Sequence, residues 1–249
     1  MENPTESKPI ISIKELHKSY GDNHVLDGFN MELIEGENLV IMGKSGSGKS
    51  VMIKCLIGLE QPDSGSIEIM GKDISKLEHE ELDELRTEIG FLFQGSALYD
   101  SMSVRENLEF PLRRHTKKFG EIKDTTPMVI EALESVGLAN AINLMPSELS
   151  GGMKRRIALA RTLILQPKII LYDEPTTGLD PITSKEIILL MKSVQQQYKT
   201  SSVIITHDVD CARVISNRMI LLIDGVNYAE GTFEELYTSQ DPKIQAFFK

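Results

Sequence analysis

The strongest chemical signal in the sequence is a glycine-rich run, Gly43-Lys44-Ser45-Gly46-Ser47-Gly48-Lys49-Ser50, which fits the pattern G-x4-G-K-[ST]. Glycines let such a loop turn its backbone N–H groups toward phosphate oxygens, and the start of a following helix adds partial positive charge. Lys49 then reaches the β- and γ-phosphates of a nucleotide, and the Ser50 hydroxyl is suited to ligate Mg²⁺. An apolar run precedes this loop and a segment with a helical pattern follows it, and this context favours a phosphate site over a plain turn.

Two adjacent carboxylates follow a second apolar run, Ile169-Ile170-Leu171-Tyr172. Ligands of open α/β sheets bind at the carboxyl ends of the strands, where Asp173 and Glu174 emerge. We expect Asp173 to hold Mg²⁺ through its water shell and Glu174 to polarise or deprotonate an attacking water. Alone, such a pair is as often a solvated turn, but beside the glycine-rich loop it indicates nucleotide hydrolysis.

A serine and two glycines, Ser150-Gly151-Gly152, directly precede an amphipathic segment that runs to Ile164. A serine at this place is also what an ordinary helix start looks like. The hydroxyl and the free N–H groups of such a start nevertheless form a second anion site. One chain thus has two phosphate-binding helix starts but one set of magnesium ligands and carboxylates. A homodimer resolves this mismatch if Ser150 of each copy caps the γ-phosphate held by Lys49 of the other.

The composition is that of an ordinary soluble globular protein. The 249 residues are 41% hydrophobic and 26% charged, which fits one large α/β domain. A net charge of −10 argues against a nucleic-acid binder. We expect no transmembrane helix, and the polar residues 1–9 predict a flexible N-terminus without a signal peptide. Two cysteines without a CxxC pair, Cys55 and Cys211, predict a reduced, cytosolic protein with incidental thiols.

Short apolar strands alternate with helices around these motifs. Alternation of this kind predicts a parallel sheet covered on both faces. The mostly helical text from about residue 104 to 164 looks like an insertion into that core. Strands are expected within residues 10–34 and at 39–42, 65–70, 89–93, 169–172 and 203–205, and helices at 49–59, 78–86 and 187–198.

Together these motifs resemble the nucleotide-binding subunit of an ABC transporter, and the resemblance covers about residues 10–245. It implies a P-loop NTPase with a RecA-like core, an antiparallel β subdomain and a helical signature subdomain at about 96–165, with 246–249 as the C-terminal end. The implied cofactors are ATP and Mg²⁺, and the implied activity is ATP hydrolysis coupled to transport. Four further positions match the family pattern: Gln94 touching Mg²⁺ and the attacking water, Asp180 crossing the dimer interface, His207 contacting the γ-phosphate and Tyr20 stacking on adenine.

A finer resemblance lies in residues 95–108, 111–116, 144–148 and 180–183, which are similar to the ATPase of bacterial phospholipid transporters that maintain lipid asymmetry. This resemblance implies ATP-driven closure of a homodimer that powers a separate transmembrane permease working with an MCE-domain lipid-binding protein. It places the chain on the cytoplasmic side of the inner membrane, as a peripheral subunit that moves phospholipids between the inner and outer membranes.

Other functions compete with this interpretation. The nearest alternative is the ATPase of a lipoprotein-releasing or small-solute transporter. An ABC ATPase acting on DNA would need a coiled-coil insertion, and a ribosome-binding factor would need two nucleotide domains; both also fit the acidic charge poorly. The one dense basic run, residues 113–118, is better explained as a solvated helix face than as a lipid head-group contact.

Apolar side chains after Gln94 form the candidate contact with the permease. The simpler interpretation is that each of them packs the helical insertion. The functional hypothesis is that some line a groove that takes a helix of the permease. The candidates are Leu98, Tyr99, Met102, Val104 and Leu108.

Overall fold

The computed structural model describes residues 8–115, 118, 120 and 122–248. These residues form two compact units. The first unit consists of the described residues up to Leu82 and from Thr200 onward, and the second runs from Asp83 to Lys199. Most of the expected flexible N-terminus, residues 1–9, lies outside the described residues, and the first strand already begins at Pro9.

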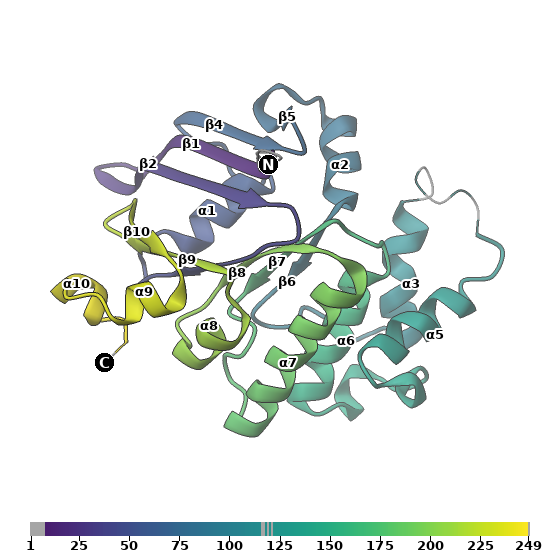
Figure 1. The fold of residues 1–249 in the computed structure, drawn as a ribbon. Coiled ribbons are helices and arrows are strands. Elements are labelled where there is room, and N and C mark those ends of the chain that lie inside the picture. The colour runs from purple at the N-terminus through teal and green to yellow at the C-terminus, as the bar shows by residue number, and fades with distance from the viewer. Residues whose placement is uncertain (1–7, 116–117, 119, 121, 249) are drawn as a thin grey trace, which may run out of the picture. The chain divides into compact units, whose positions relative to one another are not determined.

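An antiparallel sheet opens the first unit (Figure 1). Its strand order is β2-β1-β4-β5, and β1 and β2 form a hairpin in which Tyr20 pairs with Asn23. Apolar residues such as Ile11, Ile13 and Phe29 are at most 1% exposed, so the apolar side chains of these strands form a core. The strands are β1 (Pro9–Tyr20), β2 (Asn23–Ile34), β4 (Ser64–Ile69) and β5 (Lys72–Asp73).

Parallel strands form the second sheet of this unit. The strand β3 (Asn38–Met42) is buried along its whole length and pairs in parallel with β8 (Ser201–Ile205) and β9 (Arg218–Ile223). Burial on both faces explains why β3 and β8 are almost continuously apolar toward their carboxyl ends. The strand β10 (Val226–Gly231) pairs antiparallel with β9 at one edge.

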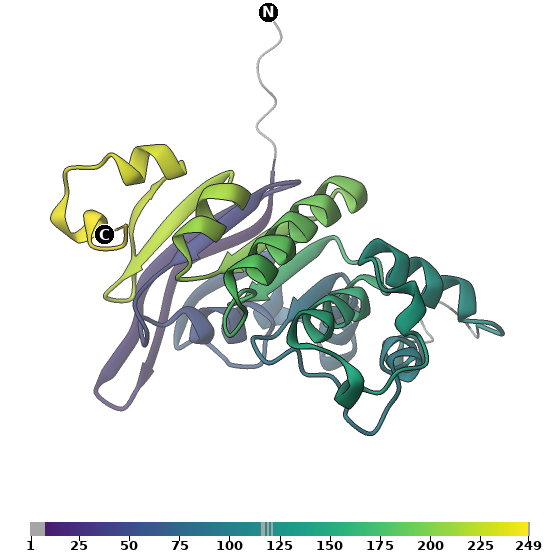
Figure 2. The ribbon, with the colours of Figure 1, turned by 90° about the horizontal axis from the view of Figure 1, so that it is seen from below.

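The helices of the first unit include α1 (Lys49–Leu56), which follows β3, and α8 (Val209–Ile215), which follows β8. The short C-terminal helices α9 (Phe233–Tyr237) and α10 (Pro242–Gln245) lie next to β10, drawn in yellow in Figure 2. A hydrogen bond of 2.8 Å from the Tyr228 hydroxyl to Asp241 ties the start of α10 to β10.

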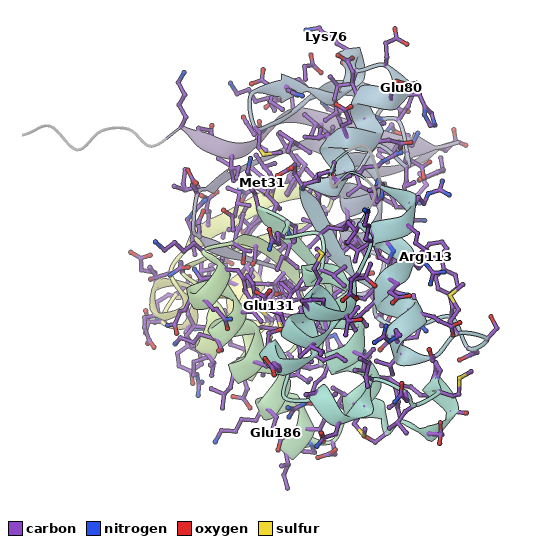
Figure 3. All side chains as sticks on the ribbon, turned by 90° about the vertical axis from the view of Figure 1, so that its right-hand side faces the viewer. Met31, Lys76, Glu80, Arg113, Glu131 and Glu186 are labelled. Atoms are coloured by element: carbon purple, nitrogen blue, oxygen red, sulfur yellow. The ribbon has the colours of Figure 1, made fainter. Side chains whose placement is uncertain are left out.

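The second unit pairs two parallel strands, β6 (Ile89–Leu92) and β7 (Ile169–Asp173), and packs helices around them. Side chains of two of these helices, Glu131 and Glu186, are labelled in Figure 3. Its helices are α3 (Val104–Arg114), α5 (Thr126–Ser135), α6 (Gly151–Leu163) and α7 (Pro181–Tyr198), and α2 (His79–Thr87) spans the boundary between the units.

The α/β architecture with an antiparallel sheet, a P-loop and a helical segment agrees with the expectation from the sequence. The helix expected at 49–59 ends at Leu56, because Gly58 takes a φ of 67° that breaks the helix. The helical insertion is part of a larger unit that also contains β6, β7 and α7. No helix within the described part of the chain is both long enough and apolar enough to cross a membrane.

Candidate functional site

The glycine-rich loop joins the buried strand β3 to α1 in the first unit. Gly48 has a φ of 101°, and a Cβ there would lie 2.7 Å from the Val25 carbonyl oxygen. A Cβ on Gly43 would lie 2.9 Å from the Leu222 oxygen and would also collide with the Ser47 side chain. Any larger residue at either place would therefore force the backbone of the loop apart.

The Lys49 side chain is folded into its own loop. Its Nζ donates to the carbonyl oxygens of Gly43 at 2.6 Å and Lys44 at 3.0 Å, and the residue is 9% exposed. The Ser47 hydroxyl is buried without a hydrogen-bond partner in this part of the structure. A buried ammonium and an unsatisfied hydroxyl beside backbone N–H groups fit a phosphate ligand.

His207 emerges at the same sheet edge as the loop. Ile41 of β3 pairs with Ile205 of β8 in parallel register, so both chains leave the sheet in the same direction. Gly43 lies two residues after Ile41, and His207 lies two residues after Ile205. The structure thus brings His207 to the loop's edge, and Asp208 next to it caps α8 by accepting from two N–H groups.

Tyr20 ends β1 in the same unit, and its residue is 46% exposed. Beyond the following turn, Asn23, His24 and Val25 help to line a pocket of about 640 Å³. Residues 44–47 of the glycine-rich loop form another wall, and the β9–β10 turn and α10 complete the pocket. The loop tip therefore borders a cavity rather than packing against the core.

The carboxylates lie in the second unit, at the end of β7. Leu92 of β6 pairs with Tyr172 of β7 in parallel register. Gln94 and the pair Asp173–Glu174 therefore leave the same edge of this strand pair. The side chain of Gln94 is exposed, whereas Asp173 and Glu174 are half-buried.

Glu174 has an unusual backbone for a residue with a side chain. Its φ is 49°, in the left-handed region that costs an L-residue about 1–2 kcal/mol. The Thr177 hydroxyl donates to its Oε2 at 3.2 Å, and the Thr177 N–H donates to its carbonyl oxygen at 3.3 Å. Strain of this kind persists only where surrounding contacts hold it, and it concentrates at functional sites.

Arg155 of α6 is a site residue that sequence reasoning missed. Its guanidinium donates to the Phe93 carbonyl oxygen at 2.7 Å and to that of Thr177 at 3.4 Å, and the residue is 4% exposed. Burial lowers the pKa of this guanidinium, and the nearby Asp173 carboxylate opposes that shift. Arg155 thus ties the exit of β6 to the loop after β7. It lies between Lys154 and Arg156 in the sequence, so nothing in the residue types singled it out.

The two remaining motifs start neighbouring helices of the second unit. Ser150 caps α6 by accepting from the Met153 N–H at 3.2 Å. Asp180 caps α7 by accepting from the Ile182 and Thr183 N–H groups, both at 3.0 Å, and from the Thr183 hydroxyl. The hydrogen bond from the Thr183 hydroxyl is the main cause that lowers the pKa of Asp180.

Gly152 is explained by the packing of these helix starts. A Cβ at this position would lie 2.6 Å from the Thr183 Cγ2, too close for any side chain without displacement. A Cβ at Gly151 would make only an ordinary contact, 3.7 Å from the Leu179 Cδ2. The second glycine therefore allows α6 and α7 to approach, while the first leaves the N-terminus of α6 open.

Two of the five candidate groove residues pack the interior instead. Val104 and Leu108 are both fully buried, so they pack the interior of the second unit and cannot line a surface groove. Leu98 and Met102 are half-buried, and Tyr99 is 43% exposed. Of the basic run, Lys117 lies outside the described residues, while Arg113, labelled in Figure 3, pairs with Glu109 at 3.2 Å.

A self-sufficient metal centre is not visible among the residues the structure describes. No three His, Cys, Asp or Glu side chains gather there as a ligand set. Mg²⁺ normally keeps several waters and binds through one or two carboxylates plus phosphate oxygens. A Mg²⁺ ion that arrives with a nucleotide therefore needs no cluster of three such side chains.

Comparison with known proteins gives the family. The family model described as "ABC transporter" matches residues 26–177. An "Intermembrane phospholipid transport system ATP-binding protein MlaF" of Haemophilus influenzae is 40% identical over 96% of this chain and 90% of its own length. A "Probable ribonucleotide transport ATP-binding protein mkl" of Mycobacterium leprae is 42% identical over 95% of this chain and 68% of that protein. A "Methionine import ATP-binding protein MetN" of Clostridium tetani is 38% identical over 95% and 73%.

Solved structures agree with the same assignment. A dimeric, post-hydrolysis ATP-binding cassette, MJ0796 with ADP and Pi bound, superposes with a TM-score of 0.80 and 34% identity, covering 90% of this chain and 98% of that one. The cbiO1 protein of Clostridium perfringens, part of an ABC transporter complex, gives a TM-score of 0.85 at 28% identity and covers 97% and 95%. The chain therefore belongs to the ABC transporter family and is an ATP-hydrolysing subunit within it.

Proposed function

We propose that this chain works as a homodimer with Mg·ATP and powers the movement of phospholipids between membranes. The observation that carries the proposal is the similarity to the phospholipid transport ATPase of Haemophilus influenzae, which spans nearly the full length of both proteins. The relatives named for mycobacterial ribonucleotide transport and clostridial methionine import are matched over only 68% and 73% of their own length. Because these relatives are named for different cargoes, the cargo of this chain has to be tested by experiment.

In the first unit, the backbone of residues 43–48 and the start of α1 bind the phosphates. Lys49 leaves its carbonyl partners and neutralises the β- and γ-phosphates, and Tyr20 stacks on the adenine. Ser50 and Asp173 hold Mg²⁺, which when bound neutralises charge that develops on the phosphates. The buried Ser47 hydroxyl and the steric need for glycine at two loop positions support this assignment.

In the second unit, Glu174 accepts a proton from the attacking water or polarises it, and Gln94 orients that water from the neighbouring strand end. His207, from the edge that carries the glycine-rich loop, contacts the γ-phosphate. The strained backbone of Glu174 and its hydrogen bond from Thr177 support a fixed position for this carboxylate.

Dimerisation completes each site. We assign Ser150, Gly151 and Gly152 to the γ-phosphate of the ATP bound by the other copy, and Asp180 to the interface between the copies. The exposed Ser150 hydroxyl still has its proton to donate while it accepts from the Met153 N–H. ATP-driven closure then does the mechanical work, and hydrolysis resets the dimer.

The permease-docking surface is proposed at the loop between β6 and α3. Phe93 and Tyr99 are 44% and 43% exposed, and Arg161 holds the loop by donating to the Ala97 carbonyl oxygen at 2.8 Å and lying 5.7 Å from the Tyr99 ring centroid. A fixed loop that presents aromatic rings suits a helix of the permease, because aromatic side chains dominate interface energies.

The cellular setting follows from the same proposal. The chain sits on the cytoplasmic side of the inner membrane as a peripheral subunit, and the permease works with an MCE-domain protein. The ABC ATPase domain covers residues 10–245, with its helical subdomain at about 96–165.

Co-expression with the permease that co-purifies with this chain tests the assignment. After reconstitution into proteoliposomes, we expect ATP-dependent transfer of a fluorescent phospholipid and no stimulation of ATPase activity by methionine or ribonucleotides. Stimulation by a small solute without phospholipid transfer would replace the phospholipid assignment with the small-solute alternative. The docking surface is tested in the same system: Tyr99→Glu should lose the permease on purification, whereas Ile130→Glu, at an equally exposed position on α5, should retain it.

A further inference from the structure

Tyr20, the residue assigned to the base, is held in place by two charged side chains. The Lys18 Nζ lies 5.3 Å from the centroid of the Tyr20 ring, within the range of a cation–π contact. The second charged group is the Glu60 carboxylate, which interacts with the phenol. Hydrogen bonding with Glu60, followed by burial and the negative charge of Glu60, raises the pKa of Tyr20 to about 12.

Lys18 is itself fixed by the loop that follows α1. Its Nζ donates to the Gln61 carbonyl oxygen at 2.8 Å and to the Asp63 carboxylate at 3.4 Å. The Glu60 carboxylate lies 3.8 Å away, and the Lys18 side chain is only 14% exposed. Three partners and little exposure hold the Lys18 side chain in one conformation, whereas lysines on an open surface are mobile.

Asp63 extends the same network to the backbone beside Tyr20. Its second carboxylate oxygen accepts from the Ser19 N–H at 2.7 Å, and the Asp63 N–H donates to the His17 carbonyl oxygen at 2.9 Å. The end of β1 is therefore tied to the loop after α1 on both sides of Lys18. The contacts fix the place of the Tyr20 backbone as well as that of its ring.

The arrangement leaves the ring available to a ligand. With the ammonium over one face and the residue still 46% exposed, the opposite face is where a planar base can stack. A cation on one face draws electron density from the ring, which favours stacking of an electron-rich purine on the other.

We propose that Lys18 is a positioning residue for nucleotide binding: together with Glu60 and Asp63 it holds the Tyr20 ring for stacking on the base. The inference rests on the proposed role of Tyr20 and deepens it by naming the groups that set the orientation of the ring.

The test compares two ligands in one variant. Affinities for Mg·ATP and for magnesium triphosphate, which has phosphates but no base, are measured by calorimetry. For Lys18→Met we expect ATP to bind about 3- to 10-fold more weakly, while triphosphate changes by less than about 2-fold. Lys18→Arg keeps the cation and should retain most of the preference for ATP.

The controls separate the inference from a general loss of charge or fold. Lys14→Met removes the same charge from an exposed position of the same strand and should leave both affinities as in the wild type. Triphosphate binding by Lys18→Met shows that its P-loop is folded. An equal loss for both ligands, or no loss for either, would overturn the role of Lys18.

Tyr20→Ala distinguishes the two levels of the argument. If Tyr20→Ala lowers ATP affinity about 10-fold or more relative to triphosphate while Lys18→Met does not, base stacking stands and the positioning role fails. If Tyr20→Ala leaves the ratio unchanged, the assignment of Tyr20 to the base fails and the role of Lys18 fails with it. If neither wild type nor variant binds triphosphate, the P-loop assignment itself is wrong.

Discussion

Glu174 can be tested apart from nucleotide binding, because its proposed role is in hydrolysis. Its side chain lies at the end of β7, where its own backbone conformation and Thr177 fix its position. Glu174→Gln keeps the size and the hydrogen-bond acceptor but cannot take a proton from water. We expect turnover to fall about 10²- to 10⁴-fold with little change in ATP affinity. Phosphate release measures the turnover, and equilibrium ATP binding on the same preparation measures the affinity.

The matched control is Glu131→Gln on α5, an exposed carboxylate of the same unit that is labelled in Figure 3. It should keep wild-type turnover. A Glu174→Gln protein that turns over ATP at the wild-type rate would contradict the assignment of the base.

Arg155 acts through the two loops that it joins. Arg155→Met removes charged donors from the Phe93 and Thr177 carbonyl oxygens, and we expect a loss of roughly 2–3 kcal/mol in the free energy of unfolding. Denaturant unfolding of the isolated chain measures it. Arg113→Met, whose side chain is 61% exposed, should stay within about 0.5 kcal/mol of the wild type, and an equal effect of both would refute a specific tie by Arg155.

At the scale of elements, the approach of α6 to α7 depends on Gly152. Gly152→Ala places a methyl group against the Thr183 Cγ2, and we expect destabilisation of about 1–3 kcal/mol. Thr183→Ser removes that Cγ2 and keeps the hydroxyl that bonds to Asp180, so the double variant should recover most of the loss. Unfolding free energies of the four proteins form the cycle.

Gly151→Ala completes this test. It adds a methyl group with only an ordinary contact near it and should be neutral or slightly stabilising, because alanine favours a helix over glycine. If Gly151→Ala and Gly152→Ala cost the same, close packing would not be the reason for the second glycine.

Elements with a strong local signal were predictable. The strands β3 and β7 were expected from short apolar runs, and α1 from the glycine-rich loop before it. The end of α1 was predicted too late, because the apolar pattern continues to Leu59 whereas Gly58 ends the helix. The requirement at Gly152 could not be predicted, because it arises from Thr183, which lies 31 residues further along the chain on another helix.

At the scale of the whole molecule, motif spacing led to the candidate site residues but not to the contacts that hold them. The register of β3 with β8, and of β6 with β7, explains why His207 accompanies the glycine-rich loop and Gln94 accompanies Glu174. Arg155 and Lys18 could not be assigned from sequence, because both bond to carbonyl groups of distant loops. Every residue has a backbone carbonyl, so the residue types do not show which carbonyl a side chain will bind.

The homodimer gives the last prediction, and Ser150 offers a matched pair of variants. Asp and Asn both cap helices as well as Ser does, so Ser150→Asp and Ser150→Asn should fold with equal stability. Only Asp brings a negative charge to the place assigned to a γ-phosphate. In a Glu174→Gln background with Mg·ATP, light scattering should show a dimer for Ser150→Asn. For Ser150→Asp we expect dimer affinity to fall at least about 30-fold, because like charges in contact cost several kcal/mol. Equal dimerisation of the two variants would mean that the start of α6 does not meet the phosphate of the other copy.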